Sequence, residues 1–171
     1  MVIVAEDGTG LTNANSYVDL TWVDSYFAGR GNIEWADATD NDKLVALIKA
    51  TDYLDVVYNF VGTKASSTQA LEWPRAGAED KYGEPLVGIP TILKKAAAEL
   101  ALRALSTTLL DDTDFSGRVK RERVEGAVEV EYAGDGVLQQ KTFTYVDKLL
   151  SGAGLVYGKV GSFGQLKIVR V

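Results

Sequence analysis

The spacing of apolar residues changes near residue 117, and this change limits what the chain can fold into. Before it, apolar side chains recur every three or four positions, as on one face of an α-helix. After it, apolar and polar residues alternate, as in a strand with one exposed face. The sequence therefore predicts a mainly α member of the α+β class. We expect a single domain, 1–171, with about three helices in a core over 16–110 and a β-rich arm and C-terminal element over 117–171.

Helix signals stand out at three places in the expected core. The clearest helix covers 40–58, where Thr39 can act as the N-cap with an acid three residues on. A second helix is expected over 90–106, because a proline suits the first turn and the apolar residues after it keep helical spacing. A shorter helix is expected over 21–30, with Thr21 as its N-cap.

Two alternating runs, 118–125 and 128–132, predict a β-hairpin arm. The turn between them falls at Glu125 and Gly126. In such a hairpin the basic first strand would face the second strand, which carries Glu129 and Glu131. Cross-strand ion pairs would then neutralise part of the basic charge.

Four other segments have weaker patterns. Residues 2–5 could form a short strand, and residues 145–150 a short helix. The glycine-rich stretch 152–164 is expected to be flexible, whereas 166–171 alternates cleanly and predicts a C-terminal strand.

Residues 59–88 show neither period. So long a segment inside a compact domain is usually a functional or interface loop. We expect Leu71 and Trp73 to anchor it.

The charge of −6 is unevenly distributed. Residues 1–59 contain ten Asp or Glu and three Lys or Arg, whereas the remainder has a net charge of +1. Residues 118–123 form the one dense basic cluster. This polarity suits head-to-tail subunit contacts or docking to a charged partner, although a merely solvated surface fits it equally well. The cluster could also contact phosphates, with Phe115 and Tyr132 stacking on bases, but the acidic balance argues against autonomous DNA binding.

The chain has no Cys and no His. Disulfides, thiolate nucleophiles, a Ser-His-Asp triad and imidazole metal ligands are therefore excluded. No signal-peptide pattern and no apolar run of membrane-spanning length is present. We expect a protein that resides or is assembled in a cytosol and does not enter a membrane.

Three motifs suggest a metal, a phosphate or acid–base catalysis, and none is complete. Residues 112–117 match the first half of a calcium loop, but Arg123 stands where a bidentate Glu is needed. Residues 8–10 lack the Lys–Ser/Thr ending of a phosphate loop. Asp52 and Asp55 share a helix face, yet nothing suggests an apolar pocket that would raise a pKa. We expect no catalytic residue, metal or cofactor.

Several stretches occur in an order typical of one protein family. The most specific read Ala-Thr-Asp-Tyr from Ala50 and Trp-Pro-Arg from Trp73. Others are Glu-Asp-Gly-Thr-Gly from Glu6, Ala-Asn-Ser-Tyr-Val from Ala14 and Tyr-Phe-Ala-Gly-Arg from Tyr26. Over about residues 5–132 the chain resembles a family of tailed-phage proteins labelled DnaT-like single-stranded-DNA-binding, whose members look like head–tail connector, or adaptor, proteins.

The resemblance implies a structural protein of the virion neck, assembled in the host cytoplasm. It implies a homo-oligomeric, dodecameric ring below the portal protein, which extends the DNA channel and docks the next neck or tail-completion protein. Genomic DNA would touch the ring only in transit. The family label alone implies the alternative, a single-stranded-DNA-binding replication accessory protein.

Subunit or partner contacts are expected in the 59–88 loop and the 117–132 hairpin, because a two-stranded arm gains stability by docking. The candidate interface residues are Trp73, Arg75, Arg118, Lys120, Arg121 and Arg123.

Overall fold

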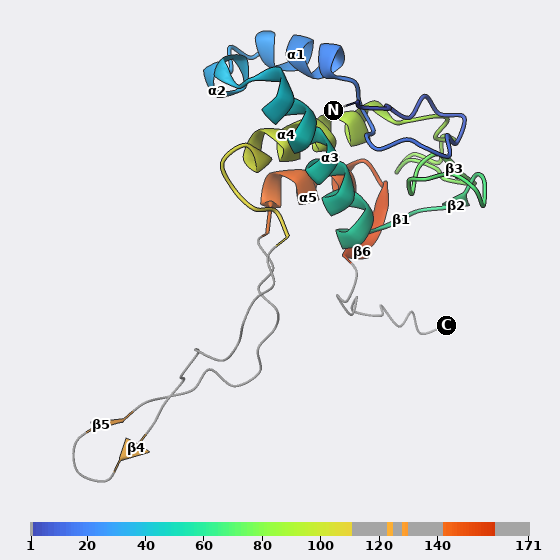
Figure 1. The fold of residues 1–171 in the computed structure, drawn as a ribbon. Coiled ribbons are helices and arrows are strands. Elements are labelled where there is room, and N and C mark those ends of the chain that lie inside the picture. The colour runs from blue at the N-terminus through green and yellow to red at the C-terminus, as the bar shows by residue number, and fades with distance from the viewer. Residues whose placement is uncertain (1, 111–122, 125–127, 130–141, 160–171) are drawn as a thin grey trace. The chain divides into compact units, whose positions relative to one another are not determined.

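The computed structural model describes residues 2–110, 123–124, 128–129 and 142–159 (Figure 1). The chain divides into two compact units: residues 110–142 form one, and the remainder forms the other. The described residues are mainly helical with small two-stranded sheets, which confirms the predicted α+β class. The helices are α1 (Leu20–Ala28), α2 (Ile33–Asp37), α3 (Asp40–Val57), α4 (Thr91–Ala104) and α5 (Thr144–Gly152).

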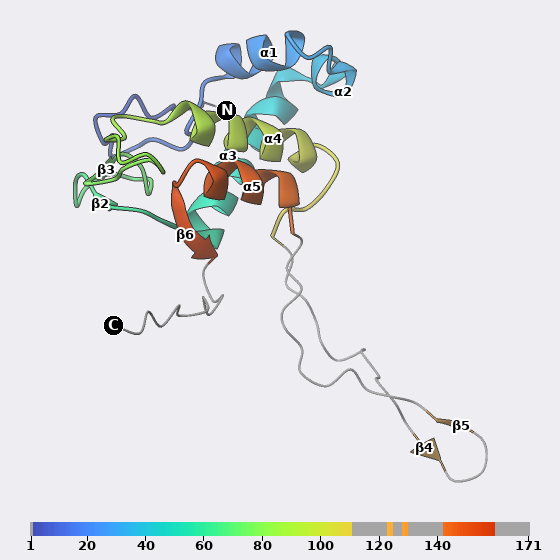
Figure 2. The same cartoon turned by 180° about the vertical axis from the view of Figure 1, so that it is seen from behind.

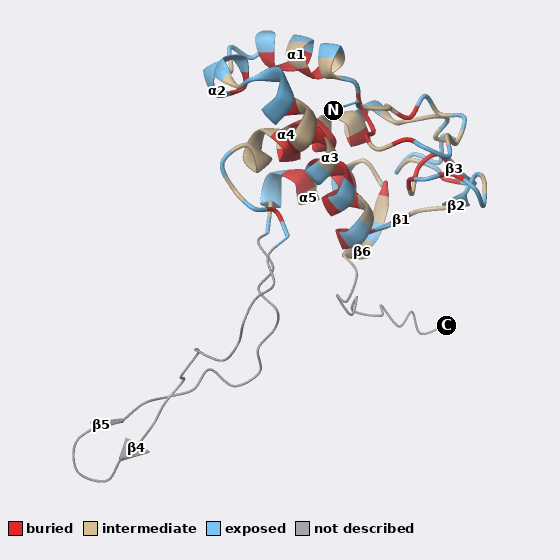
Figure 3. Cartoon of the chain, in the orientation of Figure 1, coloured by how far each residue is buried: buried red, intermediate tan, exposed pale blue. Residues whose placement is uncertain are grey.

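The centre of the larger unit is the pair α3 and α4 (Figure 1). Four alanines of α4 are buried, which lets the two helix backbones approach closely, and Leu93 and Leu100 fill the space beside them. Figure 2 shows α5 lying along α4, where it buries Val146 and Leu150. The red segments of Figure 3, which mark buried residues, gather where these three helices meet.

The predicted helix over 40–58 is confirmed as α3, and Thr39 is its N-cap, with its hydroxyl accepting the Asp42 amide at 3.2 Å. The helix expected over 90–106 is α4, and the short one over 145–150 is α5. For α1 the predicted cap is wrong. Asp19 is the N-cap, and its carboxylate accepts the Trp22 amide at 2.9 Å.

The helix α2 was not predicted. With five residues it is too short to show a hydrophobic period, although Asn32 gives it an ordinary N-cap by accepting the Trp35 amide at 2.8 Å. Its buried Trp35 packs on Phe27 of α1, with ring centroids 5.1 Å apart, and donates to Asp24 at 2.8 Å. These contacts stabilise α2 from outside the helix itself.

The cap of α1 gives a direct test. We expect Asp19→Ala to lower the free energy of unfolding by about 1 kcal/mol, because the Trp22 amide loses its acceptor. Thr21→Ala, at the cap that the sequence suggested, should change it by less than about 0.5 kcal/mol. Equilibrium urea unfolding of both variants measures the difference, and equal losses would show that Asp19 does not cap α1.

The strands are short and pair in three antiparallel sheets. They are β1 (Tyr58–Phe60) with β6 (Val156–Lys159), β2 (Thr63–Lys64) with β3 (Arg75–Ala76), and β4 (Arg123–Val124) with β5 (Val128–Glu129). The last pair confirms the predicted hairpin, and it places Arg123 opposite Glu129.

Two sequence-based expectations about strands are corrected. Residues 2–5 make only a single bridge, between Ala5 and Ser16. The glycine-rich stretch 152–164 was expected to be flexible, yet it contains β6. Its hydrogen bonds to β1 stabilise a strand that the local sequence does not favour. The predicted strand over 166–171 lies outside the described residues. Within the larger unit, α5 packs on α4 and β6 pairs with β1.

Candidate functional site

The loop 59–88 is anchored as the sequence suggested. Trp73 is fully buried and Leu71 is nearly so. The Trp73–Pro74 peptide bond is cis. The Trp73 ring packs edge-on against Phe60, with centroids 6.0 Å apart. A residue buried in this way within one unit offers no surface to a neighbour, so Trp73 acts as an anchor and not as a direct contact.

Arg75, the second candidate interface residue, is bound inside its own loop. Its Nε donates to the Val61 carbonyl at 2.8 Å and its Nη2 to the Gly62 carbonyl at 2.9 Å. Its Nη1 pairs with Glu72 Oε2 at 2.8 Å, and Lys64 pairs with the other Glu72 oxygen at 3.1 Å. A planar guanidinium suits this role because its fork of donors reaches several acceptors at once. Arg75 therefore closes the β2–β3 turn.

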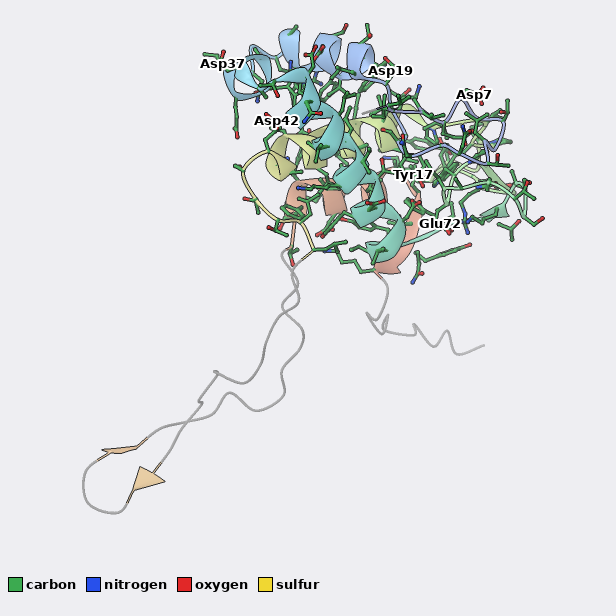
Figure 4. All side chains as sticks on the ribbon, viewed as in Figure 1. Asp7, Tyr17, Asp19, Asp37, Asp42 and Glu72 are labelled. Carbon is green, nitrogen blue, oxygen red and sulfur yellow. The ribbon has the colours of Figure 1, made fainter. Side chains whose placement is uncertain are left out.

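Three of the family-like stretches meet at Tyr17. Its hydroxyl donates to Asp55 Oδ1 and accepts the Trp73 amide at 3.3 Å. The other Asp55 oxygen accepts the Glu72 amide at 3.2 Å, and Thr51 accepts the Tyr17 amide at 3.3 Å. Figure 4 shows Tyr17 and Glu72 beside α3. We call Tyr17, Asp55 and the amides of Glu72 and Trp73 the clamp, since they hold the loop on α3.

Burial is the dominant electrostatic influence in the clamp. It raises the pKa of Asp55 to about 6, although the hydrogen bonds from Tyr17 and Glu72 oppose the rise. Burial and the Asp55 charge also raise the pKa of Tyr17. The expectation that neither Asp52 nor Asp55 lies in an apolar environment is therefore wrong for Asp55. Because Tyr17 is fully buried, the pair is closed to substrates and its role is structural.

The glycine turn at residues 8–10 is also occupied from within. Buried Glu6 accepts the amides of Gly8, Gly10 and Leu11 at 2.9–3.0 Å. A carboxylate of the chain stands where a phosphate would otherwise be bound. The turn is therefore not a phosphate site. The calcium-like stretch 112–117 lies outside the described residues, and no acidic cluster suited to a metal occurs among the described ones.

Of the basic candidate residues, Arg123 begins β4, and Arg118, Lys120 and Arg121 lie outside the described residues. Sequence reasoning missed a different basic site. An open hollow of about 460 Å³ lies between the 80–92 segment and α5. We call it the basic hollow; its lining includes Lys81, Tyr82, Leu86, Ile92, Lys148 and Leu149.

An acidic surface lies at the beginning of α2 and α3. We call it the acidic corner and define it by Ile33, Glu34, Asp37 and Asp40. All four are exposed, and the three acids form no ion pair in the part of the chain that the structure describes. Figure 4 shows Asp37 at this end of the unit, away from Glu72.

Comparison with known proteins gives one result. The model of a family described as "Putative DnaT-like ssDNA binding protein" matches residues 1–171, the whole chain. No curated protein and no solved structure matches the chain. Among the described helices none has both the length and the hydropathy that crossing a membrane requires.

Proposed function

We propose that this chain, which belongs to the family of putative DnaT-like ssDNA binding proteins, is a structural subunit that assembles with its own copies into a ring. Its place would be the neck of a tailed phage, where a dodecameric ring below the portal protein extends the DNA channel and docks the next neck or tail-completion protein. The family description names binding and no catalytic activity, and a subunit of this kind needs no active site.

The main support for this proposal is that the larger unit is acidic and that most of its cations are bound internally. Its described residues include sixteen Asp or Glu and eleven Lys or Arg. Six of the eleven cations are held internally: four pair with acids of the helices and loops, Arg75 closes its turn, and Arg30 lies 3.4 Å above the Tyr26 ring. Strands of DNA are held mainly through phosphate contacts, so an acidic surface of this kind favours sliding over retention.

The second unit supports assembly as well. A two-stranded hairpin is marginally stable alone and gains stability by docking on a partner. The register of β4 and β5 pairs the position of Arg123 with that of Glu129. We propose that Arg118, Lys120 and Arg121 contribute charge to subunit contacts. The variant Arg121→Glu with Arg123→Glu should then block assembly while the helical unit still unfolds cooperatively.

The family description itself favours a second function, single-stranded DNA binding in replication. The two functions differ in how the purified protein responds to a labelled oligonucleotide. We expect a structural subunit to bind no tighter than about 10 µM at about 150 mM salt, within the range of non-specific binding. Sub-micromolar binding whose affinity falls steeply with salt would contradict our proposal and support the DNA-binding function.

Assembly is the matching positive test. We expect native mass spectrometry and electron microscopy of the full chain, alone and with the portal protein, to show closed rings. A chain that stays monomeric in both conditions would contradict the proposed function, whatever its affinity for DNA.

A further inference from the structure

The basic hollow combines an apolar floor with unpaired positive charge. Leu86, Ile92 and Leu149 line it together with Lys81 and Lys148. Neither lysine forms an ion pair with any described acid. The nearby Asp80 is engaged internally, since it accepts the amides of Tyr82 and Glu84 at 2.8 and 3.0 Å. The hollow is therefore electropositive although the unit around it is acidic.

Tyr82 is an exposed aromatic residue in the lining of the hollow, which is typical of a surface that binds a partner. Its side chain is 78% exposed, and Lys81 Nζ lies 4.9 Å from the centre of its ring. Exposed aromatic rings beside an apolar depression are typical of the centre of a protein interface. An occupant of matching chemistry would present an apolar side chain for the floor and carboxylates for the two lysines.

The acidic corner has that chemistry. Ile33 is 72% exposed although it is large and apolar; exposed Glu34 and Asp37 share α2 with it, and exposed Asp40 begins α3. Like charges repel one another, so these carboxylates gain when a cation approaches. An exposed apolar side chain accompanied by acids thus complements an apolar hollow whose lining includes two lysines.

The two surfaces lie toward opposite ends of α4. Pro90, Thr91 and Ile92, at its beginning, line the basic hollow. One to two turns before its end, Glu99 accepts the hydroxyl of Tyr26 on α1 at 3.0 Å, and α1 leads into the acidic corner. Figures 1 and 2 agree that α2 lies at the end of the unit away from the beginning of α4. A contact between them must therefore join two different copies head to tail, which generates a ring if the rotation closes.

We infer that the basic hollow of one copy receives the acidic corner of the next, with Ile33 on the apolar floor and Asp37 facing Lys148. This inference rests on the proposed function and names one surface through which the copies would meet. Its prediction is a directional contact that single charge reversals break and paired reversals restore.

The test uses three variants of the full chain and one control variant in analytical ultracentrifugation. Lys148→Glu and Asp37→Lys should each weaken self-association about tenfold or more. Mixed together, they should associate again, because the intact corner of the first fits the intact hollow of the second, and the two reversed charges also attract each other. The double variant Lys148→Glu with Asp37→Lys should recover self-association. Lys49→Glu, an exposed reversal on α3 outside both surfaces, is the control.

Other outcomes overturn the inference in distinguishable ways. If the reversed variants assemble as the wild type does, the contact is wrong and the proposed function stands. If Lys148→Glu abolishes oligonucleotide binding and leaves assembly intact, the hollow is a nucleic-acid site. If the wild type itself stays monomeric, alone and with the portal protein, both the inference and the proposed function fail.

Discussion

Trp73→Ala should lower the free energy of unfolding by about 3–5 kcal/mol. The side chain is fully buried, it packs against Phe60, and its backbone amide donates to the hydroxyl of Tyr17. Removing the ring leaves a cavity under the loop and loosens the clamp. Equilibrium unfolding in urea, followed by circular dichroism, measures the loss.

The matched control is Trp22→Ala. Trp22 is only partly buried and stacks on Tyr26, with ring centroids 5.4 Å apart. We expect its loss to cost about 1–2 kcal/mol, since less apolar area leaves the core. Trp73→Phe should cost less than Trp73→Ala, because an aromatic ring still fills most of the space and Trp73 Nε1 has no hydrogen-bond partner among the described residues. If Trp73→Ala left the monomer fully stable and weakened only assembly, Trp73 would be an interface residue after all.

Trp73 shows how far sequence reasoning reaches in this chain. A large aromatic residue in a long loop could anchor the loop or contact a partner, and the pattern allows both. The structure supports the anchor, because the Trp73 amide donates to the Tyr17 hydroxyl and the Trp73 ring packs on Phe60, and both partners lie outside its local sequence. Fold class, α3 and the hairpin turn were predictable because each rests on neighbouring residues, such as Thr39 before α3.

Asp52 and Asp55 show what the sequence pattern could not predict. Both lie on α3 three residues apart, so the helical pattern treats them as equivalent. Residues 69–75 cover one of them and leave the other exposed, because Tyr17 and the Glu72 amide bind Asp55 alone. In the same way, β6 forms in a glycine-rich stretch because β1 is available as its partner. The basic hollow was missed because its residues come from two segments about 60 positions apart.

The buried carboxyl of Asp55 leads to the second prediction, a stability that rises as the pH falls. Its pKa is about 6 in the folded chain, and the unfolded chain has the ordinary value of about 3.9. The folded state therefore binds this proton more tightly, so ionised Asp55 destabilises the fold. The full effect is about 3 kcal/mol at pH 7 and above, and it is relieved as the pH falls through 6 toward 4.

Asp55→Asn should remove this dependence. The asparagine carbonyl can still accept a hydrogen bond from the Tyr17 hydroxyl, whereas its NH2 group cannot accept one from the Glu72 amide. The variant therefore loses one hydrogen bond, but it also removes the charge at this position. We expect the variant to match or exceed the wild type at pH 8 and to gain little stability between pH 8 and pH 5. The wild type should gain on the order of 1 kcal/mol over that interval.

Asp52→Asn is the control that separates this effect from general charge repulsion, because it removes one acid from the same helix outside the clamp. Urea unfolding at pH 5, 6, 7 and 8 gives the slope for each chain. Burial also raises the pKa of Asp52, so Asp52→Asn should lose a part of the slope and keep most of it, whereas Asp55→Asn should lose most of it. Two charged residues also act on Asp55. The charge of Lys64, on β2, lowers the pKa of Asp55, and the charge of Glu72, in the loop, raises it. They form an ion pair at 3.1 Å, so Lys64→Met would leave Glu72 paired with Arg75 alone. It would also remove a charge that lowers the pKa of Asp55, and the pH dependence of stability should therefore become steeper. If the unfolding free energy of Asp55→Asn still depended on pH as in the wild type, another group would be responsible. Burial of Asp55 would then not explain the pH dependence.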